Sequence, residues 1–382
     1  MLRSVSWMSP LSAAGLLILA CGTGLAGPAR AEPASAPATI PAAAPASAGG
    51  PDGTPVPATA ARARRQEAGV PVAAATVMAA PPPSFFNFSD TVVSYRFQGP
   101  SAEPGLRVQR PDGQFVGREV PKNVINLFHA NSWAYGTNLL SLDILRSGSQ
   151  DPAGNQVRRF EGVGATEFYL IYRGVLSLNK VFDTQALAIP GFVKDVGLSL
   201  GADVNTKDTT FDSEKRAGTF GLSFAFDVPA GFVNLKVQGY KEFSRNGLAG
   251  NGPVPGNSGR DAVPGFDYSH FRSVEFKMTP EFEITYTIPL PFTGLPLSLA
   301  GFNTIVLPKG RYGTINQYDT QLEFVSQTNL VLDVGQLLAN SPNRVEVFAG
   351  FQYWHNKFGG DPRRTLNTEE KALIAGVAYH LK

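Results

Sequence analysis

The sequence predicts an all-β fold, a closed antiparallel transmembrane β-barrel of about twelve strands. Apolar and polar side chains alternate with a period of two from Phe86 onwards, the connections between these segments are long and short in turn, and an export signal opens the chain. Mean hydropathy is close to zero at −0.06. A barrel accounts for this value, because its strands hide a lipid-facing row among polar residues.

Residues 1–31 are expected to form a secretory signal peptide. Arg3 supplies the positive start, Leu11–Leu19 the apolar core, and Ala29–Ala31 the small residues of a cleavage site. Two alternatives stay open, namely a membrane anchor that is retained and a lipoprotein modified at Cys21. Cys21 is the only cysteine, so the mature chain is expected to have no disulfide and no thiolate metal site.

Residues 32–83 are dominated by Ala, Pro, Gly and Ser. Such a segment buries too little apolar surface to offset its ordering entropy, so we expect a disordered periplasmic linker. It is either a plain spacer or a peptidoglycan tether that uses Arg62, Arg64 and Arg65. Five arginines and three acids lie before residue 84, which leaves equal numbers of bases and acids behind it. A neutral body without a basic stripe argues against nucleic acid as a partner.

The clearest alternation lies in residues 272–288, where a strand separates the two rows and a helix would mix them. Pro280 interrupts the apolar row and predicts a bend or bulge there. One face is expected to carry Val274, Phe276, Met278, Phe282, Ile284, Tyr286 and Ile288, and the other Ser273, Glu275, Lys277, Thr279, Glu281, Glu283, Thr285 and Thr287.

Twelve segments show this pattern or a weaker form of it. A strand of about ten residues tilted by about 40° spans an apolar band of about 25 Å. The expected strands are residues 86–97, 121–130, 135–146, 164–178, 192–205, 216–227, 231–243, 272–288, 296–306, 318–333, 343–355 and 370–381.

The connections carry independent information. Those after even-numbered strands are short, except 179–191, and those after odd-numbered strands are long. Outer-membrane barrels have short periplasmic turns and long external loops. Residues 84–382 are therefore expected to form a barrel in the cell outer membrane, in contact with the lipid bilayer and lipopolysaccharide.

A soluble β-sandwich also alternates, but its inward face must fill a dry core. Here the polar face carries many charges and could not do so. The apolar face would cover the surface continuously, which suits lipid and would aggregate in water.

With the polar face inward, carboxylates outnumber bases, which disfavours an anion pore and favours neutral or weakly cationic solutes. The sequence contains no metal or cofactor motif. The expected lumenal bases are Arg96, Arg173, Lys236, Lys277 and Arg344, and the acids are Asp90, Asp143, Glu167, Asp195, Asp203, Asp227, Glu242, Glu275, Glu281, Glu283, Asp319, Glu323, Asp333 and Glu346.

Aromatic residues at lumenal positions could stack on a flat solute such as a nucleobase. The ribose hydroxyls of a nucleoside could then bond to Glu167, Asp143 or Asn234. The alternative is that inward rings fill space and inward acids belong to structural ion pairs. The candidate rings are Tyr169, Tyr240, Phe348 and Trp354, followed by His129.

The first half contains the motifs Phe85-Phe86, Thr91 to Phe97 with Tyr95, Gly99-Pro100, Lys122 to Leu127, Trp133 to Asn138 and Leu142 to Ile144. With these motifs it resembles the Tsx-like nucleoside-specific channel-forming outer-membrane protein family, which includes the OmpK proteins. The resemblance covers roughly residues 85–175 and implies a twelve-stranded barrel that passes nucleosides, and in some members a phage or colicin receptor. The chain departs from common barrel endings, because it closes with Lys382 and not with an aromatic residue.

Two other functions stay open beside a non-enzymatic channel. A receptor or structural barrel without selective transport would expose the Pro/Gly-rich loop Asn246–Gly265. An outer-membrane hydrolase needs a Ser and a His together, for which His270 beside Ser269 or Ser273 is the only loose match.

Overall fold

The computed structural model describes the part of the chain that follows the predicted linker. The predicted signal peptide, the linker and the loop Asn246–Gly265 lie outside the described residues and stay predictions. The side chains of residues 105–109 and 318 are also outside the part of the chain that the structure describes. The described residues are 85–148, 151, 164–208, 214–245, 273–312 and 318–381.

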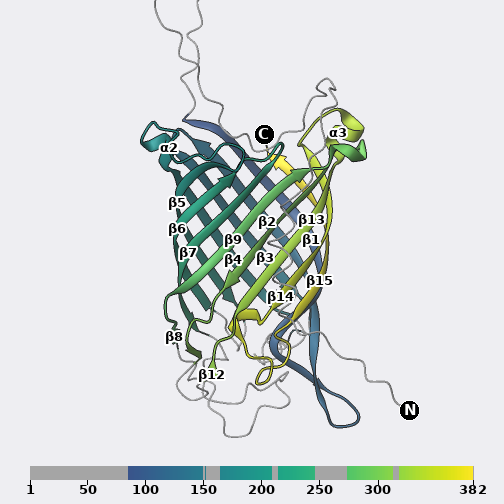
Figure 1. The fold of residues 1–382 in the computed structure, drawn as a ribbon. Helices are drawn as coiled ribbons and strands as arrows, with labels where there is room; N and C mark the ends of the chain where they lie inside the picture. The colour runs from purple at the N-terminus through teal and green to yellow at the C-terminus, as the bar shows by residue number, and fades with distance from the viewer. Residues whose placement is uncertain are drawn as a thin grey trace, which may run out of the picture. The chain divides into compact units, whose positions relative to one another are not determined.

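Within these residues, twelve long strands form one closed antiparallel barrel (Figure 1). Each strand pairs with the next along the chain, and β1 pairs with β15 from Thr91↔Leu381 to Gly99↔Leu373, which closes the ring. The predicted fold class, a closed antiparallel barrel of about twelve strands, is confirmed. The strands are β1 (Phe86–Gln109), β2 (Phe115–Trp133), β3 (Gly136–Ser147), β4 (Thr166–Ser177), β5 (Val193–Lys207), β6 (Glu214–Phe226), β7 (Phe232–Arg245), β9 (Thr279–Pro289), β10 (Leu297–Val306), β13 (Glu323–Asp333), β14 (Val345–His355) and β15 (Glu370–Leu381).

The short elements mark the two ends of the barrel. Helices α2 (Leu178–Val181) and α3 (Val334–Ala339) lie at one end, with the 3-10 turn η2 (Pro291–Thr293) in another of the short connections. Strands β8 (Ser273–Glu275) and β12 (Tyr318–Asp319) lie at the opposite end (Figure 1). Strand β11 (Arg311–Tyr312) pairs with β12, and η3 (Lys357–Gly359) follows β14.

The loop asymmetry identifies the periplasmic end. The start of β1 pairs with the end of β2, at Phe86↔Trp133, where the chain turns directly into β3. The end of β15 lies beside the start of β1, at Thr91↔Leu381. The start of β1 and the end of β15 therefore both lie on the side of the short turns, which is the periplasmic side in outer-membrane barrels.

Strands β1 and β2 are longer than predicted. Their pairing continues to Gln109↔Phe115, so most of the expected loop 98–120 is a hairpin that extends past the barrel wall (Figure 1). The pairing register of β1 and β2 shifts after Gln98 and again after Ala102. Such shifts are typical of β-bulges and account for the break in alternation. Pairing resumes beyond them, which the sequence pattern could not indicate.

The predicted segment 272–288 is divided. Residues 276–278 lie between β8 and β9, and the alternation of inward and outward side chains does not continue through them. Phe276 is therefore buried at 1% exposure, whereas Glu275 and Lys277 are exposed, the reverse of the expectation. From Thr279 onwards the predicted faces are confirmed, because Glu281 and Glu283 are buried and Phe282 is exposed.

The outer face is apolar and the inner face polar. On β6, Phe220 is 63% exposed and Leu222 41%, whereas their neighbours Thr219 and Ser223 are buried. A soluble β-sandwich would show the opposite pattern, so that alternative is excluded. The chain is an outer-membrane β-barrel protein, whose apolar row faces lipid. Among the described residues, no helix is both long and apolar enough to cross a membrane.

Candidate functional site

The interior contains more bases than the sequence predicted. Five lysines that alternation had not placed inside are buried there and paired with acids or aromatic rings. Two bases expected inside lie elsewhere, because Lys277 is exposed between β8 and β9 and Arg344 lies over the ring of Tyr379. The acids Asp227, Glu275 and Asp319 are also exposed. The excess of carboxylate is therefore smaller than predicted, although buried acids still outnumber buried bases among the described residues. The additional lysines are Lys122, Lys207, Lys215, Lys309 and Lys357.

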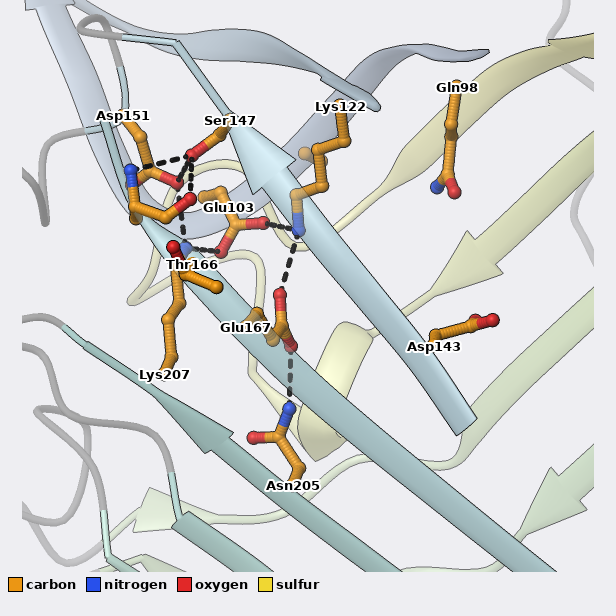
Figure 2. Close-up of polar contacts among 12 residues, drawn as sticks. Gln98, Glu103, Lys122, Asp143, Ser147, Asp151, Thr166, Glu167, Asn205 and Lys207 are labelled. Atoms are coloured by element: carbon orange, nitrogen blue, oxygen red, sulfur yellow. Dashed lines mark hydrogen bonds and ion pairs between the residues drawn. The ribbon is translucent and has the colours of Figure 1, made fainter. Parts of the chain in front are cut away.

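The first group of charges, the entrance network, lies toward the end with the long loops. Lys122 on β2 pairs with Glu103 at 2.5 Å and with Glu167 at 3.0 Å (Figure 2). Asn205 donates to the second oxygen of Glu167 at 2.6 Å. The network consists of Glu103, Lys122, Asp151, Glu167, Lys207, Lys357 and Glu370.

Glu103 connects distant parts of the barrel wall within the entrance network. Its carboxylate also lies 3.1 Å from the Lys207 ammonium at the end of β5, four strands from β1 in the sheet order (Figure 2). Lys207 has a second partner in Asp151, at 2.9 Å. Lys357, in the β14–β15 connection, pairs with Glu370 at 2.8 Å and lies 3.9 Å from Glu103. The network therefore joins residues from β15 round to β5, five steps along the ring of twelve long strands.

The second group, the mid-barrel network, centres on Arg173. Its guanidinium donates to Glu283 at 2.8 Å and to Asp203 at 2.6 Å. Lys236 donates to the other oxygen of Glu283 at 2.5 Å. Arg173 lies on β4 and Glu283 on β9, again four strands apart, so this pair also spans part of the bore. Charge-assisted bonds to both carboxylates fix the guanidinium in place.

Lysines and aromatic rings alternate along one side of the interior. The Lys215 ammonium lies 5.8 Å from the Tyr169 ring centre and 5.4 Å from that of Tyr240. Lys309 lies 5.8 Å from Tyr240 and 4.7 Å from Phe276. These distances allow cation–π attraction. Lys309 is held further by Glu242 at 2.5 Å, which also accepts a bond from the Tyr240 hydroxyl.

Six of the predicted site residues face the interior. Asp143 pairs with Arg96 at 2.6 Å, and Trp354 donates its indole N–H to Glu323 at 2.9 Å. Phe348 points over Gly376, where any added Cβ would meet its ring. Tyr240 is only 1% exposed, whereas the rings of Tyr169, Phe348 and Trp354 are partly exposed. The inward set is Asp143, Glu167, Tyr169, Tyr240, Phe348 and Trp354.

The other predicted residues lie apart from the bore. On β1 the even-numbered residues Val92 and Gln98 are buried, so Tyr95 faces outward, 46% exposed, and donates to Asn123. Phe85 stacks on Trp133 at the periplasmic rim, 5.9 Å between ring centres, beside Phe86. These rings form part of an interfacial aromatic girdle.

His129 also lies on the outer face. It shares a hydrogen bond with Thr91, which faces outward on β1. The hydrolase alternative rests on His270 and Ser269, which lie outside the described residues, while Ser273 is exposed on β8.

No family model matches the sequence, and no curated protein does. Solved structures of outer-membrane barrels are similar in fold. The translocator domain of the autotransporter NalP from Neisseria meningitidis is 11% identical with a TM-score of 0.36, covering 77% of this chain and 88% of that one. An outer-membrane channel from Pseudomonas putida F1 is 10% identical with a TM-score of 0.39, covering 79% and 100%. A BenF-like porin from Pseudomonas fluorescens Pf-5 is 9% identical with a TM-score of 0.30, covering 78% and 100%.

Proposed function

We propose that this protein is a diffusion channel of the outer membrane for small polar solutes, and that nucleosides are the class it favours. The observation that carries the proposal is the orientation of the side chains on each strand. Paired charges and amides point inward, and exposed Phe, Leu and Val point outward. A protein whose only role were to be anchored in lipid would not need so many desolvated charges in its interior, since each costs free energy to bury.

The nucleoside preference rests on rings and hydrogen-bonding groups together. Phe348 on β14 and Tyr169 on β4 are inward, partly exposed rings on which a base can stack. Asn234, on the inner row of β7, and the Asp143 carboxylate offer partners for ribose hydroxyls. The resemblance of residues 85–175 to Tsx-like channels supports the same solute class.

Liposome swelling tests both parts of the proposal. The purified mature protein should admit adenosine faster than a neutral sugar of similar size. Stacking on an aromatic side chain contributes about 1–3 kcal/mol per base, so Phe348→Ala should lower the adenosine-to-sugar ratio by about fivefold or more.

Phe351→Ala is the matched control, because Phe351 lies on the same strand but faces outward at 43% exposure. It should leave the ratio unchanged. Equal entry of both solutes into wild-type liposomes would reject nucleoside selectivity, and no entry of either would reject the channel.

A receptor role is a second candidate, favoured by the hairpin of β1 and β2. Its pairing reaches Gln109↔Phe115, far beyond the length that a bilayer requires. Paired backbone outside the membrane can present a fixed surface to a phage, a colicin or another partner. Deleting residues 107–117 should abolish adsorption of such a partner and leave solute entry unchanged, whereas unchanged adsorption would reject this role.

A further inference from the structure

Three lysines from separate parts of the barrel share one carboxylate. Lys122 on β2, Lys207 at the end of β5 and Lys357 in the β14–β15 connection all lie within 4.0 Å of Glu103. Among the described residues, Glu103 is the one acid paired with all three. Glu167, Asp151 and Glu370 each pair with a different lysine. The Glu103 carboxylate therefore lies at the point where the three ammonium groups converge.

The backbone of β1 is arranged to put this carboxylate inside. Tyr95 and Phe97 face outward, so an unbroken strand would also turn Glu103 outward. The register shifts between Gln98 and Ser101, and pairing lapses again between Ala102 and Arg107. Bulges of this kind re-aim a side chain. Glu103 reaches the interior because of them.

We propose that Glu103 is the built-in occupant of an oxyanion site formed by Lys122, Lys207 and Lys357, and that it thereby sets the charge selectivity of the bore. This inference rests on the proposed channel function. With Glu103 in place, the entrance network has three lysines and four acids, a net negative charge that repels anions. Without it the charges balance, and the three ammonium groups face an unoccupied position that a carboxylate or phosphate can fill.

The first test is chemical rescue of Glu103→Ala in the full mature protein in detergent micelles. A ligand that binds only the folded state raises the free energy of unfolding with the logarithm of its concentration. Acetate and inorganic phosphate, each at constant ionic strength, should raise the urea midpoint of Glu103→Ala. The wild type, whose site is occupied by Glu103, should need at least a tenfold higher anion concentration for the same rise of the urea midpoint.

Two controls separate the site from general salt effects. The double variant Glu103→Ala/Lys207→Met should lose the rescue, because one of the three ammonium groups is missing. Glu275→Ala removes an exposed acid paired with Lys241, outside the network, and should respond as the wild type does. Equal responses of Glu103→Ala and the wild type to both anions would overturn the oxyanion site.

The second test measures charge selectivity in planar bilayers under a potassium chloride gradient. The reversal potential of Glu103→Ala should shift from the wild-type value toward the chloride equilibrium potential, and Glu275→Ala should not shift. If the anions stabilise Glu103→Ala but its reversal potential does not shift, the selectivity role is overturned and the oxyanion site stands. A wild type that does not conduct would overturn the proposed channel, while the rescue experiment still decides whether the oxyanion site exists.

Discussion

Replacing Arg173 with Met should destabilise the barrel strongly, because this guanidinium joins strands that are not neighbours. Arg173 on β4 bonds to Glu283 on β9 and to Asp203 on β5, and the side chains of all three are less than 10% exposed. The substitution keeps much of the side-chain volume and removes the charge. It leaves two buried carboxylates with fewer partners.

The expected loss follows from what remains around each carboxylate. Glu283 keeps Lys236 at 2.5 Å, whereas Asp203 keeps, among the described residues, the more distant Lys215 at 4.0 Å. Breaking a buried pair by removing one partner costs about 3–5 kcal/mol. Because one carboxylate stays paired, we expect a loss of about 3 kcal/mol, at the lower end of that range. Equilibrium unfolding by urea in micelles, followed by tryptophan fluorescence, measures it.

Lys241→Met provides the control. Its ion pair with Glu275 lies on the exposed side of β7 and β8, with side chains 29% and 64% exposed. Exposed pairs contribute less than about 1 kcal/mol. If Arg173→Met lost no more stability than Lys241→Met, the mid-barrel network would not hold the strands together and the reasoning would be refuted. Adding Asp203→Asn should recover part of the loss, because the less well compensated charge is removed.

Three further substitutions have defined outcomes in the same unfolding assay. Phe220→Lys puts a charge on the lipid face at the middle of β6, where Phe220 is 63% exposed, and should cost about 2–4 kcal/mol; Thr219→Ser on the inner row is its control. Tyr240→Phe removes one donor to the buried Glu242, which keeps its bond from Lys309, and should cost about 1–3 kcal/mol. Gly231→Ala should cost at least about 1 kcal/mol, because its φ is +74° and a Cβ would lie 1.9 Å from the Thr287 oxygen. A loss below about 0.5 kcal/mol in any of them contradicts the contact concerned.

Alternation within a strand was enough to predict the fold, because the period of two fixes which row meets lipid. β15 covers residues 370–381 as predicted, and on β9 the predicted faces of Glu281 and Phe282 are confirmed. The reversal at Phe276 escaped prediction, since a break between β8 and β9 leaves no trace in the pattern of residue types.

The interior network was predicted only in part, for a physical reason. Lys207 ends β5, and Lys357 follows the end of β14. At such positions the residue types do not distinguish an inward polar residue of a strand from a polar loop residue. Glu103 is turned inward by bulges, and Lys309 reaches Glu242 from a connection. Pairing partners 67 or 104 residues apart in sequence are set by the register of the whole barrel, which one strand cannot reveal.

A channel of this fold requires inner-row residues to meet water while outer-row residues meet lipid. Replacing residues 346–352 of β14 one at a time with cysteine tests this directly, because the single native Cys21 lies in the predicted signal peptide. In liposomes, a water-soluble thiol reagent should modify the cysteines at 346, 348, 350 and 352 at least tenfold faster than those at 347, 349 and 351. Equal rates along the strand, or faster reaction at the odd-numbered positions, would contradict the account.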